Sequence, residues 1–261
     1  MSTQQDYTSI CAAIENDVYS FWRKVAVISG NKVSINNDLS WVMSDNSDWP
    51  NRIFRARLNP ADVNEKITTV VNQIKLGNIP KIWTITPSSI PKDLGEQLLA
   101  HGFYQYNVQS GMAIDLLTTT IIPKQQNREL VIHRCHNLDT LRQFKSVSDT
   151  AFNRNVNFDI FVKMLNEKSI HFYVGSIHDH VVATLIISYS ATFAGLHLVT
   201  THPNYRKRGI AATMVRNALY DIQTQGYPFV VLQASQLGEG IYQKIGFKKH
   251  LDLMHYALDP S

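Results

Sequence analysis

The stretch LHLVTTHPNYRKRGIAATMV, residues 196–215, decides which fold we expect for this chain. It begins as an apolar strand, passes through a loop with Pro203 and a basic glycine turn, and ends as the start of a helix. A glycine lets the backbone approach a ligand closely, and the free N–H groups and dipole of a first helical turn favour an anion. Arg206, Lys207 and Arg208 add positive charge beside Gly209. The stretch therefore predicts a phosphate-binding turn, with a solvated basic helix start as the alternative.

The segments on both sides of this stretch predict a unit of mixed helices and strands. Upstream, residues 129–136 indicate a strand, 137–152 a helix capped by Asn137 and 158–168 a second helix. An antiparallel meander then follows, with strands at 169–177, 181–190 and 195–201. Downstream, the pattern predicts a helix at 210–226 that ends at Gly226, a strand at 229–235, a short helix at 237–245 and a final strand at 246–258. The predicted order is strand, two helices, three strands, helix, strand, helix, strand.

This half of the chain resembles the GNAT superfamily of N-acetyltransferases. Arg206, Gly209 and Ala211 match the family's pyrophosphate motif, which is Arg or Gln, two residues, Gly, one residue, then Gly or Ala. Residues 242–247, YQKIGF, resemble its Tyr-x-x-x-Gly-Phe signature, and the order of elements from Glu129 to Leu258 agrees. The resemblance implies an α/β (α+β) fold, with a central mixed, mostly antiparallel sheet flanked by helices.

A weak internal repeat relates the two halves of the chain. LGEQLLAHGFYQYNVQSGMAIDL, from Leu94, resembles LGEGIYQKIGFKKHLDLMHYAL, from Leu237, apart from a one-residue gap before the Gly-Phe pair. Chance similarity is the alternative. The polar stretch 118–128, with Pro123, indicates a linker between the halves. We therefore expect two tandem copies: a degenerate GNAT-like or accessory domain at residues 1–120 and an acetyl-CoA-binding N-acetyltransferase domain at 121–261.

The resemblance also implies a reaction and a set of cofactor contacts. A primary amine would attack the thioester of acetyl-CoA directly, without a covalent enzyme intermediate. Ser235, at the end of a predicted strand, would touch the cofactor, although a helix N-cap is an equal alternative. The other residues implied in cofactor binding are Val199, Thr200 and Thr201 for the pantetheine arm, and Arg206, Lys207, Arg208, Gly209, Ile210, Ala211 and Ala212 for the pyrophosphate.

Two side chains are the candidates for proton transfer. Tyr242 suits the general acid because a phenol stays protonated at neutral pH, and a packing role is its alternative. His197 precedes Val199 by two residues, so strand alternation predicts that both face the same side, where the imidazole could accept a proton through water. A structural histidine is the alternative. Members of the superfamily often use a glutamate on this strand, but no carboxylate occurs between Val181 and Arg216. This departure leaves the base open. Glu239 is a further candidate, and its alternative is a first-turn charge that stabilises a helix N-terminus.

The acceptor is expected beside the loop between the first two helices of this half. The stretch AFNRNVNFDIF, residues 151–161, supplies Phe152, Arg154, Phe158 and Phe161, which suit a flat or anionic group. Core packing is the alternative for the phenylalanines. Buried packing is also the default for the four tryptophans, although they could line a cleft between the domains. They are Trp22, Trp41, Trp49 and Trp83.

Composition limits the remaining function classes. The chain has 261 residues, of which 44% are hydrophobic and 18% charged, and this excludes a mostly disordered protein. The net charge of +4 is modest and fits a phosphorylated cofactor, so we expect no nucleic-acid partner. The two cysteines lack metal-ligand spacing, so we expect no bound metal. No long apolar run and no secretory signal is visible, so we expect no membrane contact and a cytoplasmic protein. The expected partner is a small-molecule or peptide amine acceptor, with a homodimer left open. The competing function is a non-catalytic, regulatory acetyl-CoA-binding module.

Overall fold

The structure, a computed structural model, describes residues 2–121, 127 and 129–259. Part of the predicted linker at 118–128 therefore lies outside the described residues. The N-terminal half contains α1 (Ser2–Ser29), β1 (Lys32–Ile35), β2 (Ser40–Met43), β3 (Arg52–Phe54), α2 (Val63–Lys75), β4 (Ile82–Ile85), α3 (Leu94–Ala100) and β5 (Phe103–Asp115). None of the helices in the described residues combines the length and apolar character that a membrane span needs.

The C-terminal half has the predicted order of elements. They are β6 (Val131–Arg134), α4 (Leu138–Phe152), α5 (Phe158–Leu165), β7 (Ile170–Ile177), β8 (His180–Tyr189), β9 (Ala194–Thr201), a 3-10 turn (Pro203–Tyr205), α6 (Ile210–Thr224), β10 (Phe229–Ala234), α7 (Glu239–Ile245) and β11 (Lys248–Leu258). The predicted cap of α4 is confirmed, because the Asn137 side chain accepts a hydrogen bond from the Thr140 N–H at 2.9 Å. The predicted meander of β7, β8 and β9 is antiparallel throughout.

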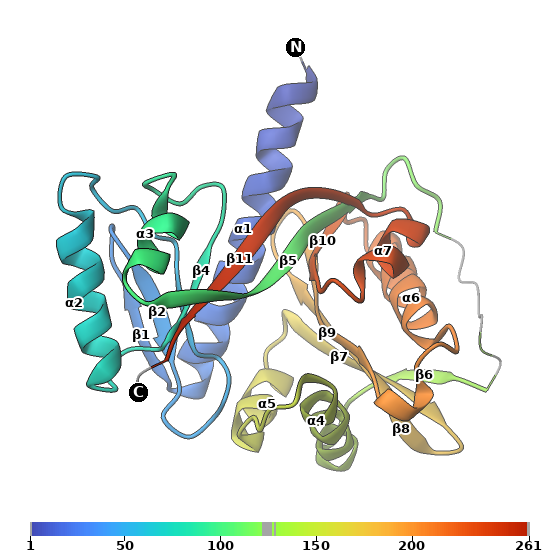
Figure 1. Ribbon diagram of the computed structural model, residues 1–261. Helices are drawn as coiled ribbons and strands as arrows, with labels where there is room; N and C mark the ends of the chain where they lie inside the picture. The colour runs from blue at the N-terminus through green and yellow to red at the C-terminus, as the bar shows by residue number, and fades with distance from the viewer. Residues whose placement is uncertain (1, 122–126, 128, 260–261) are drawn as a thin grey trace.

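Within the described residues, eleven strands form one sheet in the order β1-β2-β3-β4-β11-β5-β10-β9-β8-β7-β6. The last strand of each half is exchanged into the other half. β5 lies between β10 and β11, and β11 lies between β4 and β5 (Figure 1). Both exchanged strands follow a short helix and a Gly-Phe pair, at Gly102 and Gly246, as the sequence repeat predicts. The predicted fold class is confirmed, whereas the division at residue 120 stays a prediction.

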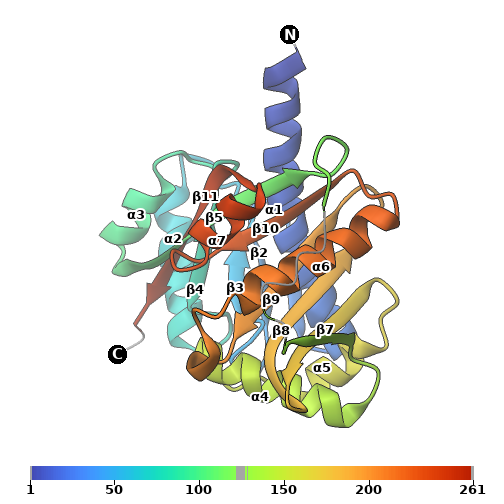
Figure 2. The same ribbon diagram turned by 90° about the vertical axis from the view of Figure 1, so that its right-hand side faces the viewer.

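Three apolar cores hold the sheet and helices together. The first lies between the sheet and α1, α4 and α5. The second lies between the strands of the C-terminal half and α6 and α7, and the third joins α2 and α3 to the strands of the N-terminal half. The first turns of α1 project beyond the sheet in both views, whereas its later turns cross behind β5 and β10 (Figures 1 and 2). This long helix of the N-terminal half therefore packs against strands of both halves.

Candidate active site

The two parallel strands β9 and β10 separate in the middle of the C-terminal half. They pair from Ala194–Val230 to Leu196–Leu232, and the parallel register ends there. Beyond this point β9 continues beside β8, and β10 continues beside β5. Backbone groups on the inner edges of two diverging strands can bind an extended ligand as an added strand would.

A bulge at the point of separation changes which way the side chains of β9 face. The pairing of β8 with β9 shifts register between Thr184 and Ile186, and Leu198 has a φ of 46°. The Thr184 hydroxyl donates a hydrogen bond to the Leu198 carbonyl at 2.9 Å. As a result, His197 stacks on α1, whereas Val199 packs against the core that contains α6. The expectation that these two side chains share a face is wrong, because the extra residue reverses the alternation.

The basic glycine turn opens α6 with the geometry of an anion site. Gly209 is the N-cap of α6 and has a φ of 72°, and Lys207 is also left-handed, with a φ of 63°. The Thr213 N–H makes the first intrahelical bond, to the Gly209 carbonyl at 3.0 Å, so the preceding N–H groups of the first turn lack a partner within the helix. Arg206 donates from Nε to the Thr201 carbonyl at 3.3 Å, which ties the turn to the end of β9. Arg206, Lys207 and Arg208 are exposed, Ala211 and Ala212 are half-buried, and Ile210 is buried.

Tyr242 lies on α7 and packs in the core between the strands of the C-terminal half and α6. Its side chain is only 8% exposed, and its ring packs edge-on against Phe247, with centroids 5.7 Å apart. Burial raises the pKa of the Tyr242 phenol above its usual value, so the hydroxyl keeps its proton at neutral pH. A protonated hydroxyl in this place can act as a proton donor. Its role nevertheless stays a prediction.

Ser235 and Glu239 lie where β10 leads into α7. The Ser235 carbonyl, rather than its hydroxyl, accepts from the N–H groups of Gly238 and Glu239, so the side chain does not cap the helix. The Ser235 residue itself is exposed. The Glu239 carboxylate accepts hydrogen bonds from the Ser110 hydroxyl at 2.7 Å and from the Gln243 amide at 2.9 Å. These bonds fit the structural alternative for Glu239.

His197 belongs to a buried polar cluster that includes a carboxylate from α1. Its ring stacks on that of Phe21, with the ring centroids 3.7 Å apart and the ring planes nearly parallel, at 4°. His197 Nε2 lies 3.0 Å from the Ser188 hydroxyl and 3.4 Å from Asp17 Oδ1. Asp17 also accepts from the Ser188 hydroxyl at 3.3 Å and from the Gln233 amide at 3.2 Å. Since Gln233 is on β10 and His197 on β9, the Asp17 carboxylate bridges the two strands where they separate.

Asp17 and Gly195 are the residues of this cluster that sequence reasoning missed. A Cβ at Gly195 would overlap the Asp17 carboxylate, so only glycine leaves room for it. The helical periodicity of the sequence around Asp17 could have identified it as a buried carboxylate. Asp17 lies on the same stripe of α1 as the buried residues Ile14, Val18 and Phe21, where a charged side chain is unusual unless it has a partner.

The comparison with known protein families decides what this geometry belongs to. Residues 134–249 match the family model of the acetyltransferase (GNAT) domain. This segment is a GNAT acetyltransferase domain. Such a domain supports acetyl transfer from an acyl-CoA donor in general. No curated protein sequence matches the chain.

Solved structures extend the likeness beyond the GNAT domain to almost the whole chain. A GCN5-related N-acetyltransferase from Kribbella flavida has a TM-score of 0.70 at 13% identity, over 94% of this chain and 95% of its own. One from Sphaerobacter thermophilus has a TM-score of 0.63 at 15% identity, over 85% of this chain and 81% of its own. A functionally unknown conserved protein from Staphylococcus epidermidis has a TM-score of 0.62 at 15% identity, over 87% of this chain and 92% of its own. At these identities the likeness concerns the fold alone.

The predicted acceptor residues of the GNAT domain separate into a core group and a surface group. Phe161 is fully buried among Phe144 and Phe172, as the core alternative predicts. Phe152 is exposed and Phe158 is half-buried. The Arg154 guanidinium lies over the rings of Phe152, at 4.6 Å, and Trp49, at 5.5 Å. Of the other tryptophans, Trp22 and Trp83 are buried and Trp41 is half-buried.

The N-terminal half repeats part of the GNAT arrangement without its anion site. β3 and β4 are parallel neighbours that pair at Ile53–Trp83, as β9 and β10 do. The helix between these two strands, α2, begins after Asp62 and carries Glu65 in its first turn. Negative charge at a helix N-terminus repels an anion. This half therefore lacks the basic glycine turn that opens α6.

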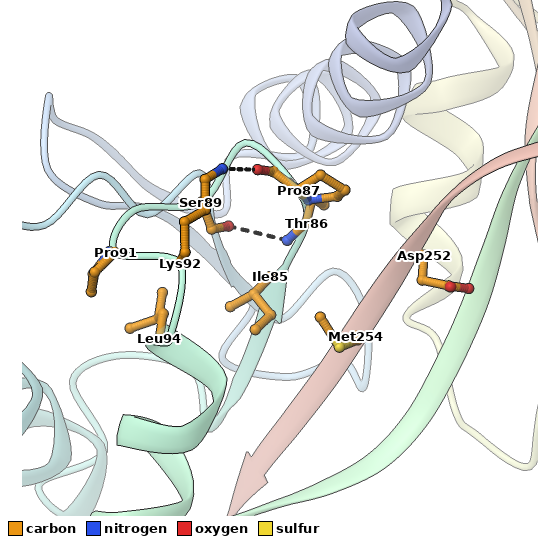
Figure 3. A pocket seen from close by; sticks show the side chains of 9 residues that line it. All are labelled: Ile85, Thr86, Pro87, Ser89, Pro91, Lys92, Leu94, Asp252 and Met254. Carbon is orange, nitrogen blue, oxygen red and sulfur yellow. Dashed lines mark hydrogen bonds between the residues drawn. The ribbon is translucent and has the colours of Figure 1, made fainter. Parts of the chain in front are cut away.

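A cavity of about 230 Å³ lies in this half, between the end of β4, the start of α3 and β11 (Figure 3). Its polar groups are satisfied locally. The Ser89 N–H donates to the Thr86 carbonyl at 2.9 Å, and the Thr86 N–H donates to the Ser89 hydroxyl at 3.1 Å. Lys92 donates from Nζ to the Pro87 carbonyl. The Asp252 carboxylate, on the β11 side, is paired with Lys249 at 2.7 Å. These polar groups of the cavity therefore have partners within the chain.

Proposed function

We propose that the chain is an acetyl-CoA-dependent N-acetyltransferase that moves an acetyl group to a primary amine by direct attack. One observation carries this proposal: β9 and β10 separate after Leu196 and Leu232, and the chain continues from β9 into the left-handed Gly209 turn that opens α6. The separation suits an extended thioester arm, and the turn suits its phosphates. The proposal also rests on the GNAT domain at residues 134–249.

The residues along this path fit acetyl-CoA. The Thr201 hydroxyl is buried and has no hydrogen-bond partner within the described chain, and such a group is costly unless a ligand satisfies it. Val199 and the two threonines after it would hold the pantetheine arm through their backbones. Residues 206–212 would hold the pyrophosphate, and Ser235 would touch the cofactor from the end of β10. When bound, acetyl-CoA supplies a thioester as the acetyl donor.

Tyr242 and His197 would divide the two proton transfers between the faces of the sheet. Tyr242, on the side of α6 and α7, would give the proton of its hydroxyl to the departing thiolate sulfur. His197, on the side of α1, would take the proton that the attacking amine loses. Its Nε2 lies against Ser188 and Asp17, which leaves Nδ1 to accept that proton, directly or through water. The Asp17 carboxylate would orient the ring and stabilise the imidazolium that forms.

The test uses the full chain, acetyl-CoA and a panel of primary amines that includes dipeptides and amino sugars. Calorimetry measures acetyl-CoA binding, and release of free thiol measures transfer. We expect binding, and thiol release that depends on at least one amine and on a functional group at residue 242. Binding without amine-dependent release would support the non-catalytic module instead. Absence of acetyl-CoA binding would reject both functions.

A further inference from the structure

Two loops from opposite halves of the chain are locked together beside the His197 cluster. One is the connection from β2 to β3, and the other joins α4 to α5. The Asp48 N–H donates to the Asn155 carbonyl at 3.1 Å, and the Asn155 N–H donates back to Asp48 Oδ2 at 2.6 Å. The Asn157 N–H donates to the Ser47 hydroxyl at 3.0 Å. This contact fixes the position of one half relative to the other.

Each side of this contact contributes an arginine that is half-buried against a tryptophan. Arg52 opens β3, and its guanidinium lies 5.9 Å from the Trp22 ring. Arg154 lies in the loop after α4, between Trp49 and Phe152. The Asp48–Asn155 contact holds the two loops that carry these arginines together, and the charge of Arg52 disfavours that of Arg154. Burial and the charge of Arg52 lower the pKa of Arg154 to about 10, although Asp149 and Asp48 oppose that shift.

Neither arginine forms a direct ion pair within the described residues. Across the described residues, no carboxylate lies within ion-pair distance of either guanidinium. Each makes one hydrogen bond to a neutral oxygen: Arg52 donates to the Asn51 carbonyl at 2.7 Å, and Arg154 to the Ser148 hydroxyl at 3.4 Å. The Nε of each is buried without a partner.

The two nearest carboxylates have other partners. Asp149 accepts from Lys145 Nζ at 2.6 Å, and Asp48 accepts from the Asn155 backbone. Two guanidinium groups that are partly withdrawn from water and make no direct bond to a carboxylate cost free energy in the folded protein. A bound oxyanion would remove that cost, because a guanidinium fork matches carboxylate and phosphate oxygens.

Arg154 is connected to the proposed site of transfer through a row of aromatic rings. Phe21 stacks on His197 and lies 5.9 Å from Trp49, on which Arg154 packs. We propose that Arg52 and Arg154 together bind an oxyanion carried by the acceptor, so that the substrate is a primary amine with a carboxylate or a phosphate. This inference rests on the proposed function and adds the substrate class. The N-terminal half then takes part in acceptor recognition through Arg52.

The experiment compares acceptors that differ only in the anion. One arm pairs glycylglycine with glycylglycinamide, and the other pairs phosphoethanolamine with ethanolamine. For Arg52→Gln and Arg154→Gln we expect kcat/KM on the anionic member of the preferred pair to fall about 10-fold to 100-fold, mainly through KM. The neutral member should change less than about twofold, and the preferred arm identifies the oxyanion. Arg142→Gln is the control, because Arg142 is on α4 and packs on Phe158 but is paired with Asp139 and largely exposed.

A second measurement does not need transfer. Inorganic phosphate, added with coenzyme A already bound, should raise the Tm of the parent and of Arg142→Gln but not that of Arg52→Gln or Arg154→Gln. Equal losses on anionic and neutral acceptors, or equal phosphate stabilisation of all variants, would overturn the oxyanion site. If phosphate discriminates between the variants but no amine is acetylated, the site stands and the proposed transferase activity fails.

Discussion

At the scale of single residues, the packing of the Tyr242 ring does not account for its hydroxyl, to which we assign proton transfer. The ring is buried beside Phe247, and the described structure contains no hydrogen bond from its hydroxyl. We predict that Tyr242→Phe lowers turnover about 100-fold to 10,000-fold, the usual contribution of a general acid, while the acetyl-CoA Kd and the Tm stay near the parental values. Single-turnover transfer measures the chemical step. The exposed Tyr220→Phe is the control, and a parental single-turnover rate for Tyr242→Phe would leave Tyr242 a packing residue.

The Asp17–His197 pair makes a second prediction at this scale. His197→Gln should lower kcat/KM about 100-fold or more because the base is lost, and Asp17→Asn should lower it by a smaller factor. The double variant should lose little more than His197→Gln alone, since Asp17 acts through the imidazole. Glu15→Gln is the matched control, because Glu15 is a buried carboxylate on the same helix that accepts from the Ser88 N–H instead. Losses that simply multiply in the double variant would contradict the coupling.

At the scale of elements, the order of helices and strands in the C-terminal half could be predicted because apolar periodicity and capping residues are local signals. Asn137 caps the start of α4, and Gly226 follows the end of α6, where the pattern placed them. The bulge at Leu198 could not be predicted, because a leucine with a positive φ opposes its own propensity and is held there by pairing with β8. That one residue reversed the predicted orientation of His197. The Asp17 carboxylate beside His197 comes from α1, which is distant in sequence.

The start of α6 carries the third prediction. Gly209→Val places a β-branched residue at a φ of 72° and should weaken acetyl-CoA binding at least about tenfold, through backbone strain and obstruction of the phosphates. Gly226→Val is the matched control, because Gly226 follows the other end of α6 with a φ of 82° and has open space around it. The control should lose stability through the same kind of strain but keep the parental Kd in calorimetry. Equal Kd changes in the two variants would remove the assignment of the phosphate turn.

At the scale of the whole molecule, the sequence repeat identified the two segments that are exchanged, but it could not reveal the exchange. The helix and Gly-Phe pair are local features, and they occur as predicted before β5 and before β11. Which strands become neighbours depends on pairing between residues more than a hundred positions apart, such as Gly111 with Leu251. Periodicity along one strand carries no information about that partner. The exchange also explains why Gly111 must lack a side chain, since a Cβ there would overlap Leu251 and Ile14.

The exchange carries the last prediction, in which the chain is cut between Thr120 and Ile121 and the two fragments are studied apart and together. β5 separates β10 from β11 and pairs with both, so a fragment of residues 121–261 leaves both strands with an open edge and loses the α1 residues that cover His197. Neither fragment alone should unfold cooperatively, because three cores that depend on both halves are opened. Mixed during refolding, the fragments should recover a single unfolding transition and bind one acetyl-CoA per pair, since the Gly209 turn occurs in only one of them. Parental acetyl-CoA affinity in residues 121–261 alone would show that the GNAT domain does not need the exchanged strand.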